Sequence, residues 1–126
     1  MIIFPFEAMG RDTEKSQLDV VRGTLDVLIL KALIWGSLHG YAITDLIRRQ
    51  TDKALLIEEG TLYPALWRLE NKGLVEADWG LSENNRKAKF YALTASGRAQ
   101  LRAEQTNFTR FANAVFAALA APRLGS

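Results

Sequence analysis

Side chains that can donate hydrogen bonds gather in one short stretch of this sequence, residues 59–74. Tyr63, Arg68, Asn71 and Lys72 supply a phenol hydroxyl, a guanidinium, a carboxamide and an ammonium group. Such groups bind oxygen-rich partners, and the guanidinium and the carboxamide also match the edges of nucleic-acid bases. The sequence shows no Ser/His/Asp set, no paired carboxylates and no glycine-rich phosphate loop. The stretch therefore predicts binding and not catalysis.

The same stretch has the periodicity of an amphipathic helix. Its apolar residues recur at the spacing of one buried helical face, Leu62, Ala65, Leu66 and Leu69. We expect Thr61 to be the N-cap, Pro64 to lie in the first turn, where a missing N–H is harmless, and Gly73 to end the helix. A short helix with one apolar face and one donor face is typical of recognition in the DNA major groove. The alternative is an ordinary surface helix whose polar groups meet only water.

Composition narrows the possible classes. The chain has 126 residues, of which 48% are hydrophobic, enough for one domain with a real core. It has no cysteine and one histidine, which excludes disulfides and thiol chemistry and leaves no metal set, so no cofactor is expected. The formal net charge of +2 does not by itself indicate a nucleic-acid partner. Without a membrane-length apolar run or a signal-like start, a cytoplasmic protein is expected.

Two further helices are predicted before this stretch. Residues 23–35 are apolar almost throughout, which is typical of a central core helix. A second helix begins at residues 39–41, His-Gly-Tyr, and His39 is expected to be a turn or packing residue. In the connection, residues 55–57 are expected to form a short edge strand or a packed loop. Glu58 and Glu59 suit the start of a helix, although they would oppose nearby phosphates.

A β-hairpin is predicted after the recognition helix. Residues 74–79 alternate apolar and polar side chains, residues 82–85 are turn formers, and residues 89–93 form the returning strand. The basic residues of the hairpin tip are Arg86, Lys87 and Lys89. We expect them to contact DNA phosphates.

Thr94 is expected to cap a last helix over residues 95–120. Its apolar seam is predicted to pair with a second copy of the chain, through Leu101, Phe108, Phe111, Val115 and Leu119. Several aromatic residues spread beyond one narrow seam, and they are expected either to complete a dry core or to wall a slot for a planar effector. The slot would be formed by Trp35, Phe108, Phe111 and Phe116, while Trp67 and Trp79 are expected to be packing residues or further walls.

The order of these elements predicts a mainly α fold with a small β-hairpin wing (α+β), a winged helix-turn-helix with a C-terminal dimerisation helix. Three parts are expected: an N-terminal arm over 1–22, loose or docked on a partner subunit, a DNA-binding domain over 23–94, and a dimerisation helix and tail over 95–126. A two-fold dimer would bind an inverted-repeat operator in double-stranded DNA. No membrane contact is expected.

The sequence also resembles the PadR-like (phenolic acid decarboxylase regulator) winged-helix transcription factors over roughly residues 20–103. The similar motifs are residues 23–30 (GTLDVLIL), 39–41 (HGY), 59–66 (EGTLYPAL), 68–70 (RLE), 73–74 (GL) and 91–98 (YALTASGR).

The resemblance implies a homodimeric repressor that a small aromatic or drug-like ligand can release from DNA. It implies DNA contacts at Thr61, Tyr63, Pro64 and Arg68, and at the basic wing residues. Lys72 joins this set as a donor on the same helix. The competing hypothesis is a winged helix that binds only protein, since fold does not fix function.

Overall fold

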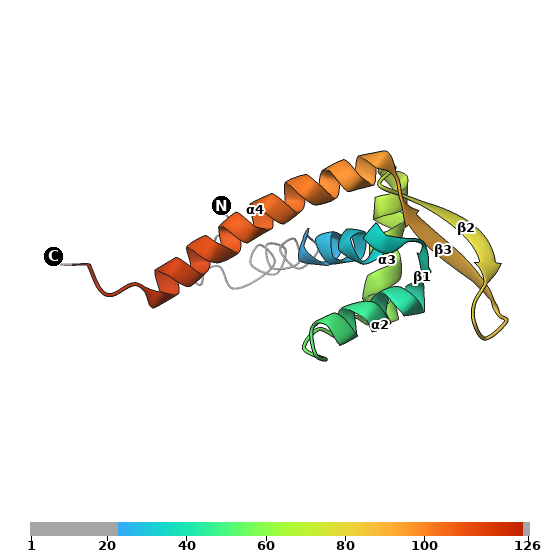
Figure 1. The fold of residues 1–126 in the computed structure, drawn as a ribbon, viewed down its shortest axis with the longest axis horizontal. Coiled ribbons are helices and arrows are strands. Elements are labelled where there is room, and N and C mark those ends of the chain that lie inside the picture. Colours follow the sequence, from blue (N-terminus) through green and yellow to red (C-terminus); the bar gives the residue numbers. More distant parts are fainter. Residues whose placement is uncertain (1–22, 125–126) are drawn as a thin grey trace, which may run out of the picture.

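The computed structural model describes residues 23–124, with four helical segments and a small sheet (Figure 1). A first helix over residues 23–32 continues into a short 3-10 turn, η1. The other elements are η1 (Leu33–Trp35), β1 (Leu38–His39), α2 (Gly40–Gln50), α3 (Glu59–Asn71), β2 (Val75–Leu81), β3 (Lys87–Leu93) and α4 (Ala95–Ala120). The three strands form an antiparallel sheet in the order β1-β3-β2. The predicted fold class, mainly helical with a hairpin wing, is confirmed.

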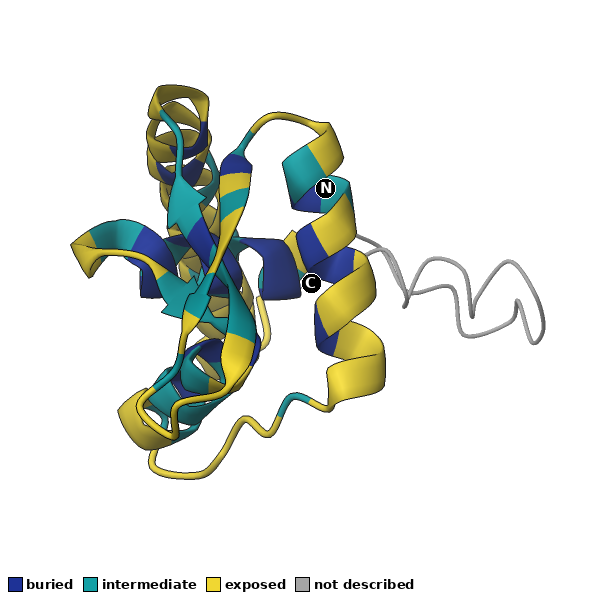
Figure 2. Cartoon of the chain, turned by 90° about the vertical axis from the view of Figure 1, so that its right-hand side faces the viewer, coloured by how far each residue is buried: buried dark blue, intermediate teal, exposed yellow. Residues whose placement is uncertain are grey.

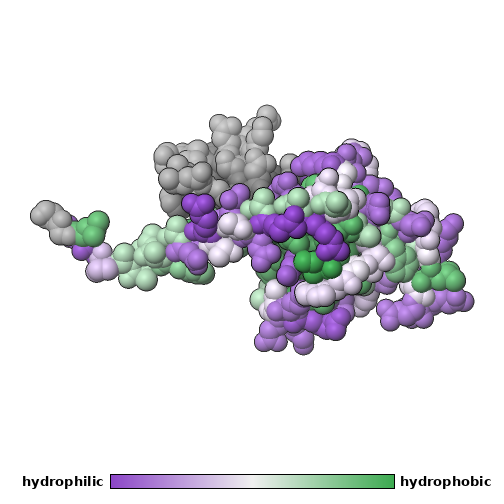
Figure 3. Space-filling view, turned by 45° about the horizontal axis from the view of Figure 1, so that its top comes forward, coloured by the Kyte–Doolittle hydropathy of each residue, from purple (hydrophilic) through white to green (hydrophobic). Residues whose placement is uncertain are grey.

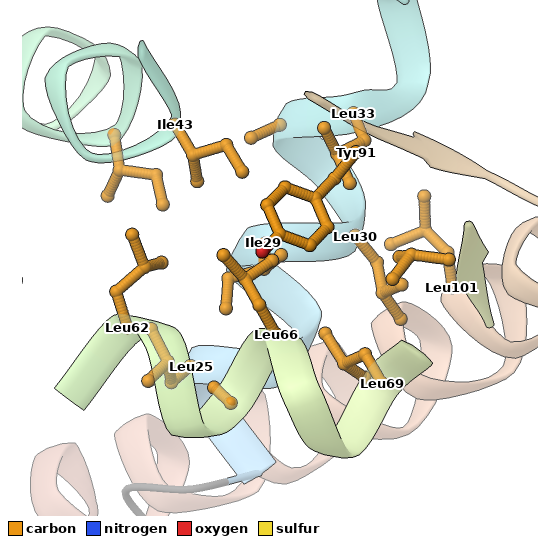
Figure 4. Packing of buried hydrophobic residues seen from close by; sticks show 14 residues of the cluster. Leu25, Ile29, Leu30, Leu33, Ile43, Leu62, Leu66, Leu69, Tyr91 and Leu101 are labelled. Carbon is orange, nitrogen blue, oxygen red and sulfur yellow. The ribbon is translucent and has the colours of Figure 1, made fainter. Parts of the chain in front are cut away.

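One hydrophobic core joins the first helix, α2, α3 and the start of α4 (Figure 4). Ile29, Leu30 and Leu33 lie at its centre, with 1% or less of each residue exposed. The predicted apolar face of α3 is buried as expected, at Leu62, Ala65, Leu66 and Leu69. Burial is concentrated where these elements meet, while the hairpin tip and the outer faces of the helices are exposed (Figure 2). The core therefore fixes how α3 is rotated about its axis.

His39 is the N-cap of α2, and the prediction of a turn or packing residue is confirmed. Its Nδ1 accepts a hydrogen bond from the Ala42 amide at 3.2 Å, and its ring packs edge-on against Phe90 at 5.4 Å between centroids. A glycine, Gly40, follows His39 because α3 passes close to this position. A Cβ atom at Gly40 would lie 2.5 Å from the Tyr63 hydroxyl oxygen. The His-Gly-Tyr motif thus serves the close approach of α2 and α3.

Of the two forms expected for residues 55–57, an edge strand or a packed loop, the structure has the loop. Residues 55–57 form no strand, and the short strand that pairs with β3 is β1, through Leu38↔Tyr91 and His39↔Phe90. Ile57 packs on the core, whereas Leu55 and Leu56 are exposed. The connection is therefore a loop held to the core by a single apolar side chain.

The predicted start of α3 is wrong by one turn. The N-cap is Glu58, not Thr61, and the Thr61 and Leu62 amides donate to the Glu58 carbonyl oxygen at 3.0 and 2.9 Å. Pro64 therefore lies inside the helix, where its missing N–H leaves the Gly60 carbonyl without an i+4 donor. Both residues are exposed, so water can hydrate that carbonyl. The end is as predicted: Gly73 has φ of 72°, and the Leu74 amide donates to the Leu69 carbonyl at 2.9 Å.

The hairpin has longer strands than predicted, because β2 extends to Leu81 and β3 begins at Lys87. The tip is a tight turn in which Asn85 has φ of 58° and the Ser82 amide donates to the Arg86 carbonyl at 2.8 Å. Lys87 and Lys89 consequently stand on a strand, opposite Leu81 and Trp79, and only Arg86 belongs to the turn.

Helix α4 begins at the sheet and projects beyond the body of the molecule (Figure 1). Thr94 caps it as predicted, accepting a hydrogen bond from the Gly97 amide at 3.0 Å. Leu101 is 2% exposed within this one chain, so it belongs to the subunit's own core and is not free for a dimer seam. Most residues further along the helix are exposed. In residues 23–124 no helix is long and apolar enough to cross a membrane.

The junction of α4 with the hairpin yields a stability prediction. A Cβ atom at Gly97 would lie 2.0 Å from the Leu74 carbonyl oxygen, a contact that only a backbone shift can relieve. We expect Gly97→Ala to lower the free energy of unfolding by about 3 kcal/mol in urea titrations. Gly60→Ala is the matched control, since nothing lies within 4 Å of the added atom. Equal stability of the two variants would contradict this packing.

Candidate nucleic-acid interface

The side chains predicted to contact DNA occupy three regions: the exposed face of α3, the contact between α3 and the first helix, and the hairpin. Thr61 and Pro64 are exposed on α3, and Tyr63 is 44% exposed on the flank that faces α2. Tyr63 thus divides its surface between Gly40 and solvent. These three residues are available to a ligand that approaches α3.

Arg68 is not on the exposed face of α3, and the prediction that its guanidinium is presented to bases is corrected here. Its Nη2 donates to Asp26 Oδ1 of the first helix at 3.0 Å, and the side chains are only 24% and 13% exposed. The Nε atom is buried without a hydrogen-bond partner among the described residues. If Arg68 left this contact, the buried Asp26 carboxylate would lose its partner. Arg68 therefore has a structural role.

The environment of Asp26 acts on its pKa in both directions, and the net effect is a raised pKa. Desolvation raises the pKa of Asp26 above its ordinary value of 3.8, while the charge and the hydrogen bond of Arg68 lower it. The charge of Lys72 lowers that pKa further, and Glu104 of α4 raises it. Lys72, the C-cap of α3, therefore acts on the side of the helix that faces the first helix and α4.

The basic residues of the hairpin differ in whether other side chains already bind them. Lys87 is exposed and its Nζ lies 5.2 Å from the centre of the Trp79 ring, while Arg86 is exposed in the turn. Lys89 instead reaches back to α3, with Nζ 3.4 Å from Glu70 Oε1. An acidic side chain therefore already binds Lys89, one of the three residues expected to contact phosphates. Its ion pair braces the wing against α3.

A wide groove separates the hairpin from the helices. We name it the wing groove; its volume is about 1040 Å³. Its lining is polar and aromatic, and it includes Tyr41, Tyr63, Trp79, Arg86, Lys87 and Lys89. Asp45 also lines it, but Arg48 and Arg49 both pair with this carboxylate, and the hydrogen bond from Arg48 is the main cause that holds its pKa below the ordinary value. The groove thus presents cations and hydroxyl groups, together with one exposed carboxylate, Glu83 of the hairpin turn.

Sequence reasoning missed two exposed aromatic residues of the wing groove, Tyr41 and Trp79, and a third, Trp67, on the exposed face of α3. Tyr41 is 71% exposed at the start of α2, Trp79 is 61% exposed on β2, and Trp67 is 65% exposed on α3. Trp67 and Trp79 were expected to be packing residues or further walls of an effector slot. The helical spacing of Trp67, opposite the buried face of α3, was a signal that could have placed it outside.

The residues predicted to wall an effector slot are not gathered by one subunit. Trp35 is 69% exposed, with Lys31 Nζ 5.3 Å from its ring centre, and Phe116 is 67% exposed on the outer half of α4. Phe108 is also exposed, and Phe111 is half-buried. A slot walled by these rings would need a second subunit.

Comparison with known proteins identifies the family to which this architecture belongs. Residues 29–103 match the model of the transcriptional regulator PadR-like family, which is more than half of the chain. The chain belongs to the PadR-like family of transcriptional regulators. The family match covers α2, α3, the wing and the start of α4, so all the residues of the wing groove lie inside it. As a PadR-like protein the chain is a transcriptional regulator and not an enzyme.

Individual relatives agree with this assignment. A transcriptional regulator from Clostridium thermocellum is 33% identical, with a TM-score of 0.69 over 77% of this chain and 94% of its own. A PadR family regulator from Eggerthella lenta is 29% identical, with a TM-score of 0.67 over 88% of this chain and 96% of its own. An uncharacterised protein of Lysinibacillus sphaericus is 37% identical over 66% of this chain and 76% of its own.

The Asp26–Arg68 pair yields a prediction about stability and pH. We expect Arg68→Ala to lower the free energy of unfolding at pH 7 by roughly 2–3 kcal/mol, somewhat less than for a fully buried pair. Without Arg68 the folded-state pKa of Asp26 should rise further. Because a raised folded-state pKa disfavours folding as pH rises through it, the defect should be larger at pH 7 than at pH 4.5.

Urea titrations at the two pH values measure this, and Asp26→Asn in the Arg68→Ala background is the control. That second change removes the unpaired charge, so it should recover part of the loss at pH 7. A defect that is independent of pH would show that Arg68 contributes by packing alone.

Proposed function

We propose that this PadR-like regulator is a homodimeric repressor that binds operator DNA through α3 and the wing. The observation that carries the proposal is that α3 and the cationic hairpin border one open groove. In this arrangement α3 enters the major groove, and a DNA strand beside it lies in the wing groove. Binding at a promoter would exclude other proteins from that site.

The chemistry of the groove supports a phosphate backbone as its occupant. Arg86 and Lys87 carry free positive charge, and the hydroxyl groups of Tyr41 and Tyr63 can donate to phosphate oxygens. The Lys87 ammonium lies 5.2 Å from the centre of the Trp79 ring, a cation–π distance, and Lys87 is exposed, so a phosphate can still reach it. We assign Lys89 a smaller share, because Glu70 already binds it.

The projecting half of α4 supports a second copy of the chain as partner. Phe108, Val115 and Leu119 continue the helical stripe that starts at the buried Leu101, and they are 44%, 38% and 79% exposed. Hydrophobic residues cover much of this part of α4 (Figure 3). A stripe that packs on the core and then continues past it fits the same stripe of another subunit. The dimer would set two α3 helices on an inverted repeat, and an aromatic effector could act by changing their spacing.

The first test of this proposal concerns the wing. Duplexes selected by the protein from a random pool provide the DNA, and the dissociation constant is measured against salt concentration. Each lost phosphate contact should reduce the slope of log K against log salt by about 0.9, so Arg86→Ala/Lys87→Ala should reduce it by about 1.8. Lys89→Ala should change it less.

The control for the wing is Arg98→Ala/Arg102→Ala, which removes the same charge from exposed positions of α4. Its slope should equal that of the parent. If both double variants reduce the slope equally, net charge and not the wing determines binding. A protein that selects no DNA would favour a winged helix that binds only protein.

The second test concerns α4. Leu119→Asp places a charge on the exposed stripe, and we expect monomers in sedimentation experiments because a carboxylate in an apolar interface is poorly tolerated. The fold should persist, since Leu119 is 79% exposed in one subunit. Ala117→Asp lies on the opposite face of the same helix and should leave the dimer intact. Dimers of the Leu119 variant would refute this interface.

A further inference from the structure

One stripe of α3 points away from the core and carries no charge. Gly60, Pro64, Trp67 and Asn71 are spaced by four, three and four residues, and all four are exposed. This spacing places them on one face of the helix. We name them the outer stripe. Its two larger polar or aromatic members, Trp67 and Asn71, lie one turn apart.

Two neighbouring charges of α3 are held away from the outer stripe by ion pairs, while Lys72, the C-cap, is exposed. Arg68 is bound to Asp26 of the first helix, and Glu70 is bound to Lys89 of the wing. The surface that α3 can press into a groove therefore offers an indole, a carboxamide and a proline ring. It offers no guanidinium, the group best suited to guanine.

The two available groups match one kind of base pair. In the major groove the thymine 5-methyl group is the apolar feature, and adenine presents N6 and N7 as a donor and an acceptor that a carboxamide can bind together. Residues one turn apart on a helix are separated by about 6 Å along its axis, against about 3.4 Å between base pairs. Trp67 and Asn71 can thus address base pairs one or two steps apart.

We infer that the outer stripe reads A·T pairs, with the Trp67 indole packed on a thymine methyl group and the Asn71 carboxamide bound to adenine. The inference rests on the proposed DNA-binding function and names the bases that the function recognises. Trp67 is 65% exposed in the subunit, so the contact removes a large apolar surface from water. Asn71 fixes the orientation of α3 on the site, because its carboxamide binds adenine in one orientation.

The experiment removes the methyl group and the indole separately and together. Each thymine of a selected duplex is replaced in turn by deoxyuracil, which lacks only the 5-methyl group. Replacement of the contacted thymine, one per half-site, should lower the affinity of the wild type about fourfold. This is the amount expected for one buried methyl group. Trp67→Ala should bind the parent duplex more weakly and should not respond to that replacement. Such loss of response is the signature of a direct contact.

Two controls separate this contact from general damage. Trp35→Ala removes the same residue type from a different surface and should keep the fourfold response. Trp67→Phe keeps an aromatic ring and should keep part of it. For Asn71, replacement of the contacted adenine by 7-deazaadenine should weaken the wild type and leave Asn71→Ala unchanged.

The possible outcomes separate a failure of this inference from a failure of the proposed DNA-binding function. A selected site without an A·T pair, or a Trp67→Ala variant that still responds to methyl removal, would overturn the inference while DNA binding stands. A wild-type protein that binds no duplex would overturn the proposed function and the inference with it.

Discussion

The burial of one face of α3 against the first helix determines what the rest of this regulator can present. Leu62, Leu66 and Leu69 are each 1% exposed or less, so α3 cannot rotate without opening the core. The Asp26–Arg68 pair adds a polar contact on the same side at 3.0 Å. Because an unpaired buried carboxylate is costly, this pair permits one rotation of the helix. That rotation turns the outer stripe toward solvent.

The wing and α4 are positioned from the ends of this core. Gly73 ends α3 with a left-handed residue and directs the chain into β2, and the Lys89–Glu70 pair ties the returning strand to α3. Thr94 then starts α4, whose Leu101 closes the core while its later turns leave the body. The wing groove, the outer stripe and the projecting half of α4 are thus all positioned from the core in which α3 packs.

Periodicity and turn residues were enough to predict most of the fold. The apolar face of α3, the glycine that ends it, the hairpin and the Thr94 cap all follow from local rules and are confirmed. Local rules failed where a contact joins distant residues. The Arg68 partner lies 42 positions away, so an arginine expected on the surface is turned inward. The start of α3 was misplaced because Glu58 begins the helix without a side-chain cap, against the preference for threonine.

The three tryptophans provide the most direct measurement of the central claim, that the outer stripe and the wing face the DNA. Trp67 lies on α3, Trp79 on the wing and Trp35 at the end of the first helical segment, and all three are more than 60% exposed. With 5-fluorotryptophan, each gives a separate ¹⁹F resonance that single Trp→Phe variants assign. Addition of a selected duplex should shift the Trp67 and Trp79 resonances and leave Trp35 unchanged. A shift at Trp35 with none at Trp67 would contradict the account.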